Sequence, residues 1–238
     1  MALLLNIDTA VDTASICLAK DGKALSISKN VREDSFGESQ KDHASWLHIA
    51  IKEIFEKNSL ELRSVDAIAV TGGPGSYTGL RIGMATAKGI CYALNRPLIS
   101  LNTLLVMANA AKDVHNSFAE SAKLLCPMID ARRMEVFTAI YTKELEIIKE
   151  PAAITLNENS FDEYLSNNSI CFFGNGSNKF RTMNRHEKAV FTDLKIDASS
   201  MVSLSEKSFA EKEFADLAYA EPLYLKEFYT PAKPPFTK

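Results

Sequence analysis

The stretch Thr71–Ile90, TGGPGSYTGLRIGMATAKGI, holds six of the ten glycines in the chain. It begins at the end of an apolar segment, 64–71, that is predicted to be a buried strand, and it runs into a helix predicted over about 78–93. A glycine-rich turn between a strand and a helix is typical of phosphate-binding loops, because helix N-termini attract anions. The first question is therefore whether this stretch binds a nucleotide.

Neither common phosphate-binding motif is present in it. A P-loop has the pattern G-x-x-x-x-G-K-[ST], and no glycine of this stretch is followed by lysine. The dinucleotide fingerprint G-x-G-x-x-G fails because Thr78 stands where its third glycine should be. Backbone N–H groups of the turn could still bind an anion, but no residue requires it. A tight turn that leads into a closely packed helix is the preferred interpretation.

The predicted helix is apolar over most of its surface, so it must be buried on more than one side. Gly79, Gly83 and Ala87 recur every four residues along one side. Small residues at this spacing let two helix backbones approach closely. Glycine inside a helix costs about 1 kcal/mol relative to alanine, so several together indicate a packing requirement. We interpret this row as a face that receives a partner helix.

A preceding helix, predicted over about 39–57, carries the only tryptophan of the chain outside its core face. That residue, Trp46, is either partly buried beneath a loop or an interface anchor, a role in which tryptophan is enriched. Both alternatives stay open from the sequence. The predicted partner interface takes residues from both helices: Trp46, Ile49, Glu53, Gly79, Ile82, Gly83, Met84 and Ala87.

Both halves of the chain show the same order of predicted elements, βββαβα. Hairpin strands followed by crossover helices predict a mixed sheet with helices packed on it, so we expect an α/β protein of two such lobes across a cleft. A length of 238 residues with 46% hydrophobic and 24% charged side chains suits this size of core. The net charge of −3 gives the surface as a whole no attraction for nucleic acid.

No segment predicts export or membrane insertion. Apolar runs stay below the roughly 18 residues that span a bilayer. Asp8 interrupts the apolar N-terminus too early for a signal peptide. The four cysteines form no C-x-x-C pair, so they are interpreted as reduced core residues of a cytoplasmic protein.

Four segments together make the chain resemble the TsaB (YeaZ) family. They are LLNIDTAVDTASICLAKDGK (4–23), GGPGSYTGLRIGMATAKGICYAL (72–94), MIDARRMEVFTAIY (128–141) and PLYLK (222–226). The resemblance covers nearly the whole chain in order, and G-P-G-S-[FY]-T-G-L-R-I-G is very specific to the family. It implies the two-lobed fold of actin, sugar kinases and Hsp70, which is ribonuclease H-like and has duplicated βββαβα sheets.

The resemblance also implies a function and partners. TsaB is a non-catalytic subunit required for threonylcarbamoyl transfer to adenosine 37 of tRNA, the nucleotide 3′ of the anticodon. It binds the catalytic subunit TsaD as a heterodimer through its first two helices, and the ATPase TsaE joins as a third subunit. Alone it forms a homodimer through the same surface. We expect no cofactor or metal in the isolated chain, ATP only in the assembled complex, and tRNA contact only through that complex.

Two enzymatic alternatives remain open. An actin-like ATPase or kinase would use Asp8 and Thr9 after the first strand, with Gly174 and Gly176 as a second phosphate loop. The turn after Thr9 lacks glycine, so these four residues are interpreted as a vestigial nucleotide site. A glycoprotease-like metallopeptidase would need metal-binding histidines after the glycine-rich helix, and the segment SLNTLLVMANAAK there has none.

The expected domain organisation has three parts: an N-terminal lobe over 1–103, a C-terminal lobe over 104–215 and a tail over 216–238. Prolines make the tail extended, and Tyr224, Phe228 and Tyr229 indicate that it docks on the body. The C-terminal lobe carries two modest basic clusters, which most often are solvated surface and could help to bind tRNA only within a complex. These are Arg132 and Arg133, and a second group of Lys179, Arg181, Arg185 and Lys188.

Overall fold

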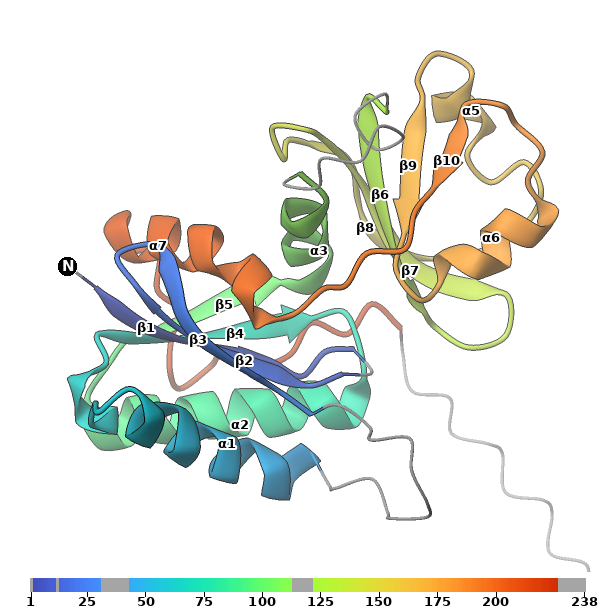
Figure 1. The fold of residues 1–238 in the computed structure, drawn as a ribbon. Helices are drawn as coiled ribbons and strands as arrows, with labels where there is room; N and C mark the ends of the chain where they lie inside the picture. Colours follow the sequence, from blue (N-terminus) through green and yellow to red (C-terminus); the bar gives the residue numbers. More distant parts are fainter. Residues whose placement is uncertain (1, 12, 31–42, 113–121, 227–238) are drawn as a thin grey trace, which may run out of the picture.

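Two five-stranded mixed sheets form the two lobes of the protein (Figure 1). The computed structural model describes residues 2–11, 13–30, 43–112 and 122–226. The sheet of lobe 1 has the order β3-β2-β1-β4-β5. Its strands are β1 (Leu3–Asp8), β2 (Ser15–Lys20), β3 (Lys23–Lys29), β4 (Ala67–Gly73) and β5 (Leu98–Asn102).

The sheet of lobe 2 repeats this arrangement, with the order β10-β9-β6-β7-β8. Its strands are β6 (Leu124–Asp130), β7 (Glu135–Thr142), β8 (Ile147–Thr155), β9 (Ile170–Phe173) and β10 (Ala189–Phe191). In each lobe the first three strands pair antiparallel and the last two join in parallel. This repetition confirms the predicted duplicated, two-lobed α/β fold of the actin class.

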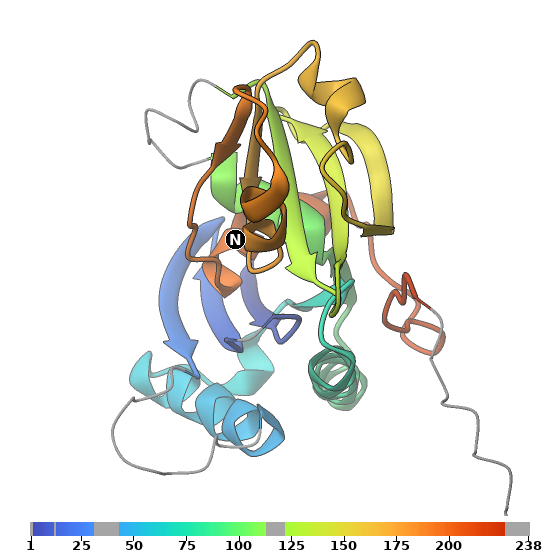
Figure 2. The same cartoon turned by 90° about the vertical axis from the view of Figure 1, so that its right-hand side faces the viewer.

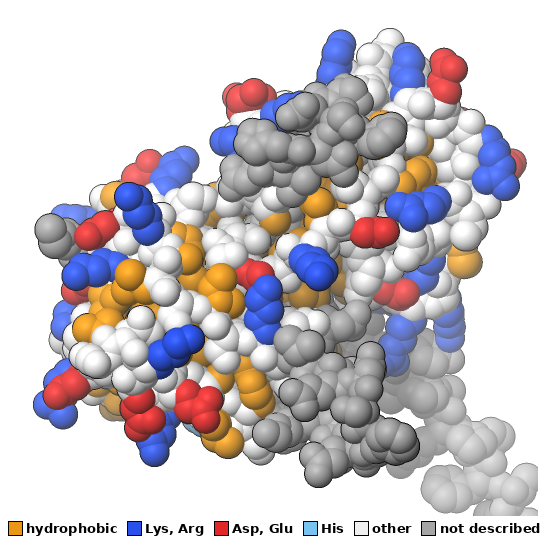
Figure 3. Space-filling model, in the orientation of Figure 1, with side chains coloured by type: hydrophobic (Ala, Val, Ile, Leu, Met, Phe, Trp, Pro, Cys, Tyr) orange, Lys and Arg blue, Asp and Glu red, His pale blue; other side chains and the backbone are white. Residues whose placement is uncertain are grey.

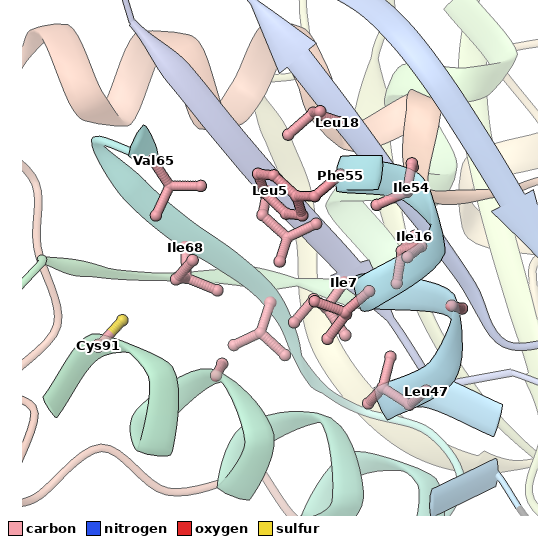
Figure 4. Packing of buried hydrophobic residues seen from close by; sticks show 14 of the residues in the cluster. Leu5, Ile7, Ile16, Leu18, Leu47, Ile54, Phe55, Val65, Ile68 and Cys91 are labelled. Atoms are coloured by element: carbon pink, nitrogen blue, oxygen red, sulfur yellow. The ribbon is translucent and has the colours of Figure 1, made fainter. Parts of the chain in front are cut away.

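Helices cover both faces of the sheet in lobe 1 (Figure 1). α1 (His43–Lys57) and α2 (Tyr77–Leu94) lie on one face, and α7 (Val202–Ala210) lies on the other. Both β1 and β4 are buried along their whole length, as expected of central strands covered on both sides. Alternate residues of β1 therefore point into different clusters. Leu5 lies in the cluster beneath α1 and α2 (Figure 4), and Leu4 lies in the cluster that includes Val202 of α7.

In lobe 2, α5 (Asp162–Leu165) and α6 (Ser177–Met183) pack on one face of the sheet. α3 (Thr103–Lys112) lies between the two sheets and packs its apolar side on the other face. Two 3-10 turns, η1 (Leu62–Ser64) and η2 (Ala198–Met201), complete the described elements. α3, α6 and β10 were not predicted as separate elements.

The predicted domain boundary at residue 215 is wrong. α7 follows lobe 2 in the sequence, but Met201 and Val202 pack with Leu4 and Ala69 of lobe 1. An apolar helix face packs where an apolar sheet face is uncovered, and the sheet of lobe 1 has one opposite α1 and α2. The chain therefore returns to lobe 1 at about residue 198, and the first part of the tail, with Ala215, Leu217 and Ala220, also packs on lobe 1.

The face of the molecule seen in Figure 3 carries Lys and Arg side chains interspersed with Asp and Glu. Hydrophobic side chains gather there over part of lobe 1. Among the exposed hydrophobic residues of lobe 1 are Leu25 at 46% and Ile27 at 39%, both on the edge strand β3. None of the described helices has both the length and the apolar character needed to cross a bilayer.

Candidate functional site

The glycine row of α2 faces the chain's own first strand. A Cβ placed on Gly79 would lie 2.0 Å from the backbone oxygen of Thr9, and one on Gly83 would lie 2.2 Å from Thr9 Oγ1. The row thus lets α2 approach the end of β1 closely. The prediction that Gly79, Gly83, Met84 and Ala87 contact a partner is wrong, because all four are buried inside the monomer.

The opposite side of α2 is exposed and also consists of small residues. Ala85, Gly89 and Ala93 are exposed, and a Cβ on Gly89 would meet no atom within 4 Å. The sequence contained this signal, since these residues lie on the second apolar side of the helix and likewise recur every four positions. Of these two similar rows, the prediction chose the one that is buried within the monomer.

α1 lies beside α2 and extends the exposed side. Ile49 is 54% exposed and Glu53 is exposed, as the sequence indicated. Trp46 and Ile82 are partly buried and both pack against the core cluster beneath the two helices. Trp46 is therefore part core and part surface. We call the combined surface the outer face: Trp46, Ile49, Glu53, Ile82, Ala85, Gly89 and Ala93.

The tail borders the outer face on the side away from α1, so that α2 lies between the two (Figure 2). Lys88 Nζ donates to the backbone oxygens of Ala218 and Ala220, at 3.2 and 2.8 Å. Near the start of α2, Arg81 Nε donates to the Tyr224 hydroxyl at 3.2 Å. The Arg81 guanidinium also lies 4.2 Å from the ring centre of Tyr77.

The tail then continues toward lobe 2. The N–H of Leu223 donates to the Gly72 oxygen at 2.7 Å, and Lys226 forms an ion pair with Glu135 of β7. Docking of the tail is thus confirmed as far as residue 226, whereas Phe228 and Tyr229 lie outside the described residues.

The predicted nucleotide site is closed around Asp8. Its carboxylate is 1% exposed and accepts hydrogen bonds from the Thr71 hydroxyl at 2.9 Å and the Ala10 N–H at 3.1 Å. Burial raises the pKa of Asp8 above its ordinary value, although both hydrogen bonds act to lower it. A Cβ on Gly75 would lie 2.3 Å from the Ala10 oxygen, so the glycine-rich turn covers the segment that follows Asp8.

Gly174 and Gly176 are explained by packing within lobe 2. Gly174 has φ +92°, and a Cβ on it would lie 2.4 Å from the Met128 oxygen. A Cβ on Gly176 would lie 2.9 Å from both the backbone carbon of Ile129 and Val136 Cγ1. The pair forms the turn from β9 into α6, held against the end of β6.

A cavity of about 460 Å³ lies between the lobes. Its lining residues are Val11, Thr13, Lys29, Met107, Gly174, Asn175, Leu194, Lys195 and Ile196. Of the four predicted nucleotide-site residues, only Gly174 is among them. Lys29 Nζ forms an ion pair with Asp197 at 2.5 Å, which ties β3 to the segment after β10. Asp8 and Thr9 are not among the residues that line this cavity, although Val11 and Thr13 of the following turn are.

The described residues hold neither a metal-binding cluster nor an exposed thiol. Among them, no group of three or more His, Cys, Asp or Glu side chains is placed to hold a metal ion. The four cysteines are buried and free, and burial raises the pKa of the Cys17 and Cys126 thiols to about 12.

Comparison with known proteins finds a family model described as TsaD and relatives named TsaB. A family model described as "TsaD: tRNA N6-adenosine threonylcarbamoyltransferase" matches residues 37–228. The "tRNA threonylcarbamoyladenosine biosynthesis protein TsaB" of Buchnera aphidicola subsp. Baizongia pistaciae is 32% identical over 182 residues, 74% of this chain and 76% of the relative. The Escherichia coli protein of the same name is 30% identical over 141 residues, 59% of this chain and 55% of the relative.

A solved structure titled "YeaZ from Pseudomonas aeruginosa" matches 94% of this chain and 100% of that chain, with a TM-score of 0.75 and 25% identity. The matched region therefore spans about half of the Escherichia coli relative and the whole of this solved chain. The TsaB relatives and the YeaZ structure agree with the resemblance that the sequence motifs indicated. The chain belongs to the TsaB (YeaZ) family.

Proposed function

We propose that the chain acts in the biosynthesis of threonylcarbamoyladenosine in tRNA as a non-catalytic scaffold. In this role it binds the catalytic subunit TsaD through the outer face and enables TsaD to transfer the threonylcarbamoyl group to adenosine 37. It needs no cofactor of its own, and ATP is used only in the assembled complex with TsaE. The complex acts in the cytoplasm, and tRNA is bound by the assembly.

The observation that best supports this role is the contrast between the two sides of α2. The inner side fits β1 so closely that a single added carbon would collide with backbone. The outer side exposes Ala85, Gly89 and Ala93, over which a second helix can approach closely. Ile49 at 54% exposure supplies an apolar contact beside this small-residue row.

Two further features support a binding role over a catalytic one. The Asp8 carboxylate is buried and accepts hydrogen bonds from groups within the chain, and Asp8 does not line the inter-lobe cavity. The thiols of the four cysteines are buried, so none is placed as an exposed nucleophile. In the absence of TsaD, two copies of the chain pair through the outer face as a homodimer.

The test is reconstitution from purified subunits. The chain alone should give no threonylcarbamoyl transfer and negligible ATP hydrolysis. Addition of TsaD, TsaE, ATP, threonylcarbamoyl donor and unmodified tRNA should give modified adenosine, and omission of the chain should abolish it. Robust ATP turnover by the chain alone, lost in Asp8→Asn, would instead favour the ATPase alternative.

A further inference from the structure

The three most exposed large hydrophobic side chains in the described part of the chain lie on α1, on α2 or on the tail beside α2. Tyr219 is 84% exposed, Tyr92 is 83% exposed, and Ile49 of the outer face is 54% exposed. Ile49 is on α1 and Tyr92 on α2, and Tyr219 is in the part of the tail that borders α2 (Figure 2). Large apolar side chains exposed together mark an interaction surface, whereas scattered single ones need no explanation.

Tyr92 continues the outer face toward the tail. Residues three and four positions apart are neighbours on an α-helix, so Tyr92 lies next to Gly89 of the outer face and next to Lys88. Lys88 Nζ donates to the backbone oxygens of the residues on either side of Tyr219, at 3.2 and 2.8 Å. The two tyrosines thus flank the same lysine at the edge of the outer face.

The backbone that carries Tyr219 forms a turn, 215–220, that is held from both sides. Asp216 Oδ1 accepts from the N–H groups of Ala218 and Tyr219, at 2.8 and 3.1 Å. The Asp216 backbone oxygen accepts from the Ala220 N–H at 2.7 Å. Apolar side chains of the same turn pack against the core cluster of lobe 1: Ala215, Leu217 and Ala220. A tyrosine presented on a backbone fixed in this way loses little conformational entropy on binding, which favours its use as an interface anchor.

The small-residue row of α2 permits close approach but supplies little contact area. Ala85 and Ala93 each have a single side-chain carbon and Gly89 has none, whereas a stable interface buries about 800 Å² on each partner. A buried tyrosine contributes about 150–250 Å². Tyr92 and Tyr219 together would therefore supply roughly 300–500 Å², about half of such an interface, directly beside the row.

We propose that the turn 215–220 is part of the surface that binds TsaD, with Tyr92 and Tyr219 as its anchors. The inference rests on the proposed function and extends the TsaD contact from α1 and α2 to the tail. Tyrosine is enriched among the residues that carry most of the binding energy of an interface. Since α2 lies between α1 and the tail, a TsaD helix over Gly89 would contact the two tyrosines along one side and Ile49 along the other (Figure 2).

The test variants are Tyr92→Ala and Tyr219→Ala, which truncate exposed side chains and leave the core of the monomer intact. By isothermal titration calorimetry each should lose about 30-fold in TsaD affinity, the effect of removing a side chain worth about 2 kcal/mol of binding. Their melting temperatures should stay within about 2 °C of the unmodified chain. The matched control is Ile147→Thr on β8 of lobe 2, where the isoleucine is 51% exposed, and it should keep the full affinity.

Asp216→Ala tests whether the turn positions Tyr219 for the partner. It removes the acceptor of two backbone N–H groups and keeps the tyrosine. In the otherwise unmodified chain it should weaken TsaD binding severalfold, and in Tyr219→Ala it should have no further effect, because the turn acts through the tyrosine. An equal loss in both backgrounds would overturn this role of Tyr219.

Unchanged TsaD affinity in Tyr219→Ala overturns the inference. Loss of self-association with TsaD affinity intact also overturns it and assigns the tyrosines to a contact between two copies of the chain. Loss of tRNA binding by the assembled complex, again with TsaD affinity intact, overturns it in favour of stacking on bases. If the unmodified chain does not bind TsaD, the proposed function itself fails. If Gly89→Leu weakens TsaD binding and neither alanine variant does, only the inference fails.

Discussion

Replacing the glycines of α2 with alanine one at a time should give effects of opposite sign. A Cβ on Gly79 would lie 2.0 Å from the backbone oxygen of Thr9, the buried residue that follows β1, and a backbone atom has no rotamer to change. A Cβ on Gly83 would lie 2.2 Å from Thr9 Oγ1, a side-chain atom that can rotate away. A Cβ on Gly89 would meet nothing within 4 Å.

The size of each change in melting temperature follows from these environments. Gly79→Ala must displace α2 from β1, and overpacking of this kind costs about 1–3 kcal/mol. For a chain of this size, 1 kcal/mol shifts the melting temperature by about 2–4 °C, so we expect a fall of roughly 2–12 °C. The melting temperature of Gly83→Ala should fall less than that of Gly79→Ala. The melting temperature of Gly89→Ala should rise by about 2–4 °C, because alanine stabilises an exposed helix interior by about 1 kcal/mol relative to glycine.

Thermal unfolding followed by circular dichroism measures all three variants under the same buffer and scan rate. The predicted order of melting temperatures is Gly89→Ala, then the unmodified chain, then Gly83→Ala, then Gly79→Ala. Equal stability of Gly79→Ala and Gly89→Ala would refute the assignment of the inner and outer sides of α2.

Three other predictions concern buried groups and the tail. The pKa of Asp8 is raised in the folded chain, so the folded state loses stability as the pH rises from the unfolded pKa through the folded pKa. Asp8→Asn carries no such charge and should therefore be more stable than the unmodified chain at pH 7 but not at pH 3. Thiol titration at pH 8 should detect no fast-reacting cysteine in the folded chain and all four after unfolding. Tyr224→Ala should speed hydrogen exchange at the Leu223 amide, which donates to Gly72, and equal exchange rates would contradict docking through the Arg81 contact.

Most of the order of strands and helices along the chain could be predicted because its signals are local. Alternating and continuous apolar segments indicated the strands, and the repeated βββαβα order indicated two lobes. Short elements were missed where the signal is weak: α6 has seven residues and β10 has three, too few for periodicity to stand out. The return of α7 to lobe 1 was missed because a hydrophobic helix face does not say which of two sheets it will cover.

The exposed side could be predicted for α1 but not for α2. α2 has two rows of small residues, and composition does not distinguish a row that fits a strand end from one that is exposed. The choice depends on where Thr9 lies relative to Gly79 and Gly83, which is a contact between segments about 70 residues apart. By contrast, Ile49 and Glu53 were placed correctly because α1 has a single clear core face.

The central claim is that the exposed side of α2 receives TsaD, and Gly89→Leu tests it most directly. Leucine fits without contact in the monomer, so the melting temperature should not fall, but it would hold a partner helix away. The matched control is Ala210→Leu at the exposed end of α7, on the opposite face of the sheet. By isothermal titration calorimetry, Gly89→Leu should lose about a hundredfold in TsaD affinity, equivalent to roughly 3 kcal/mol, while Ala210→Leu retains it. Unchanged TsaD affinity in a folded Gly89→Leu variant would contradict the account.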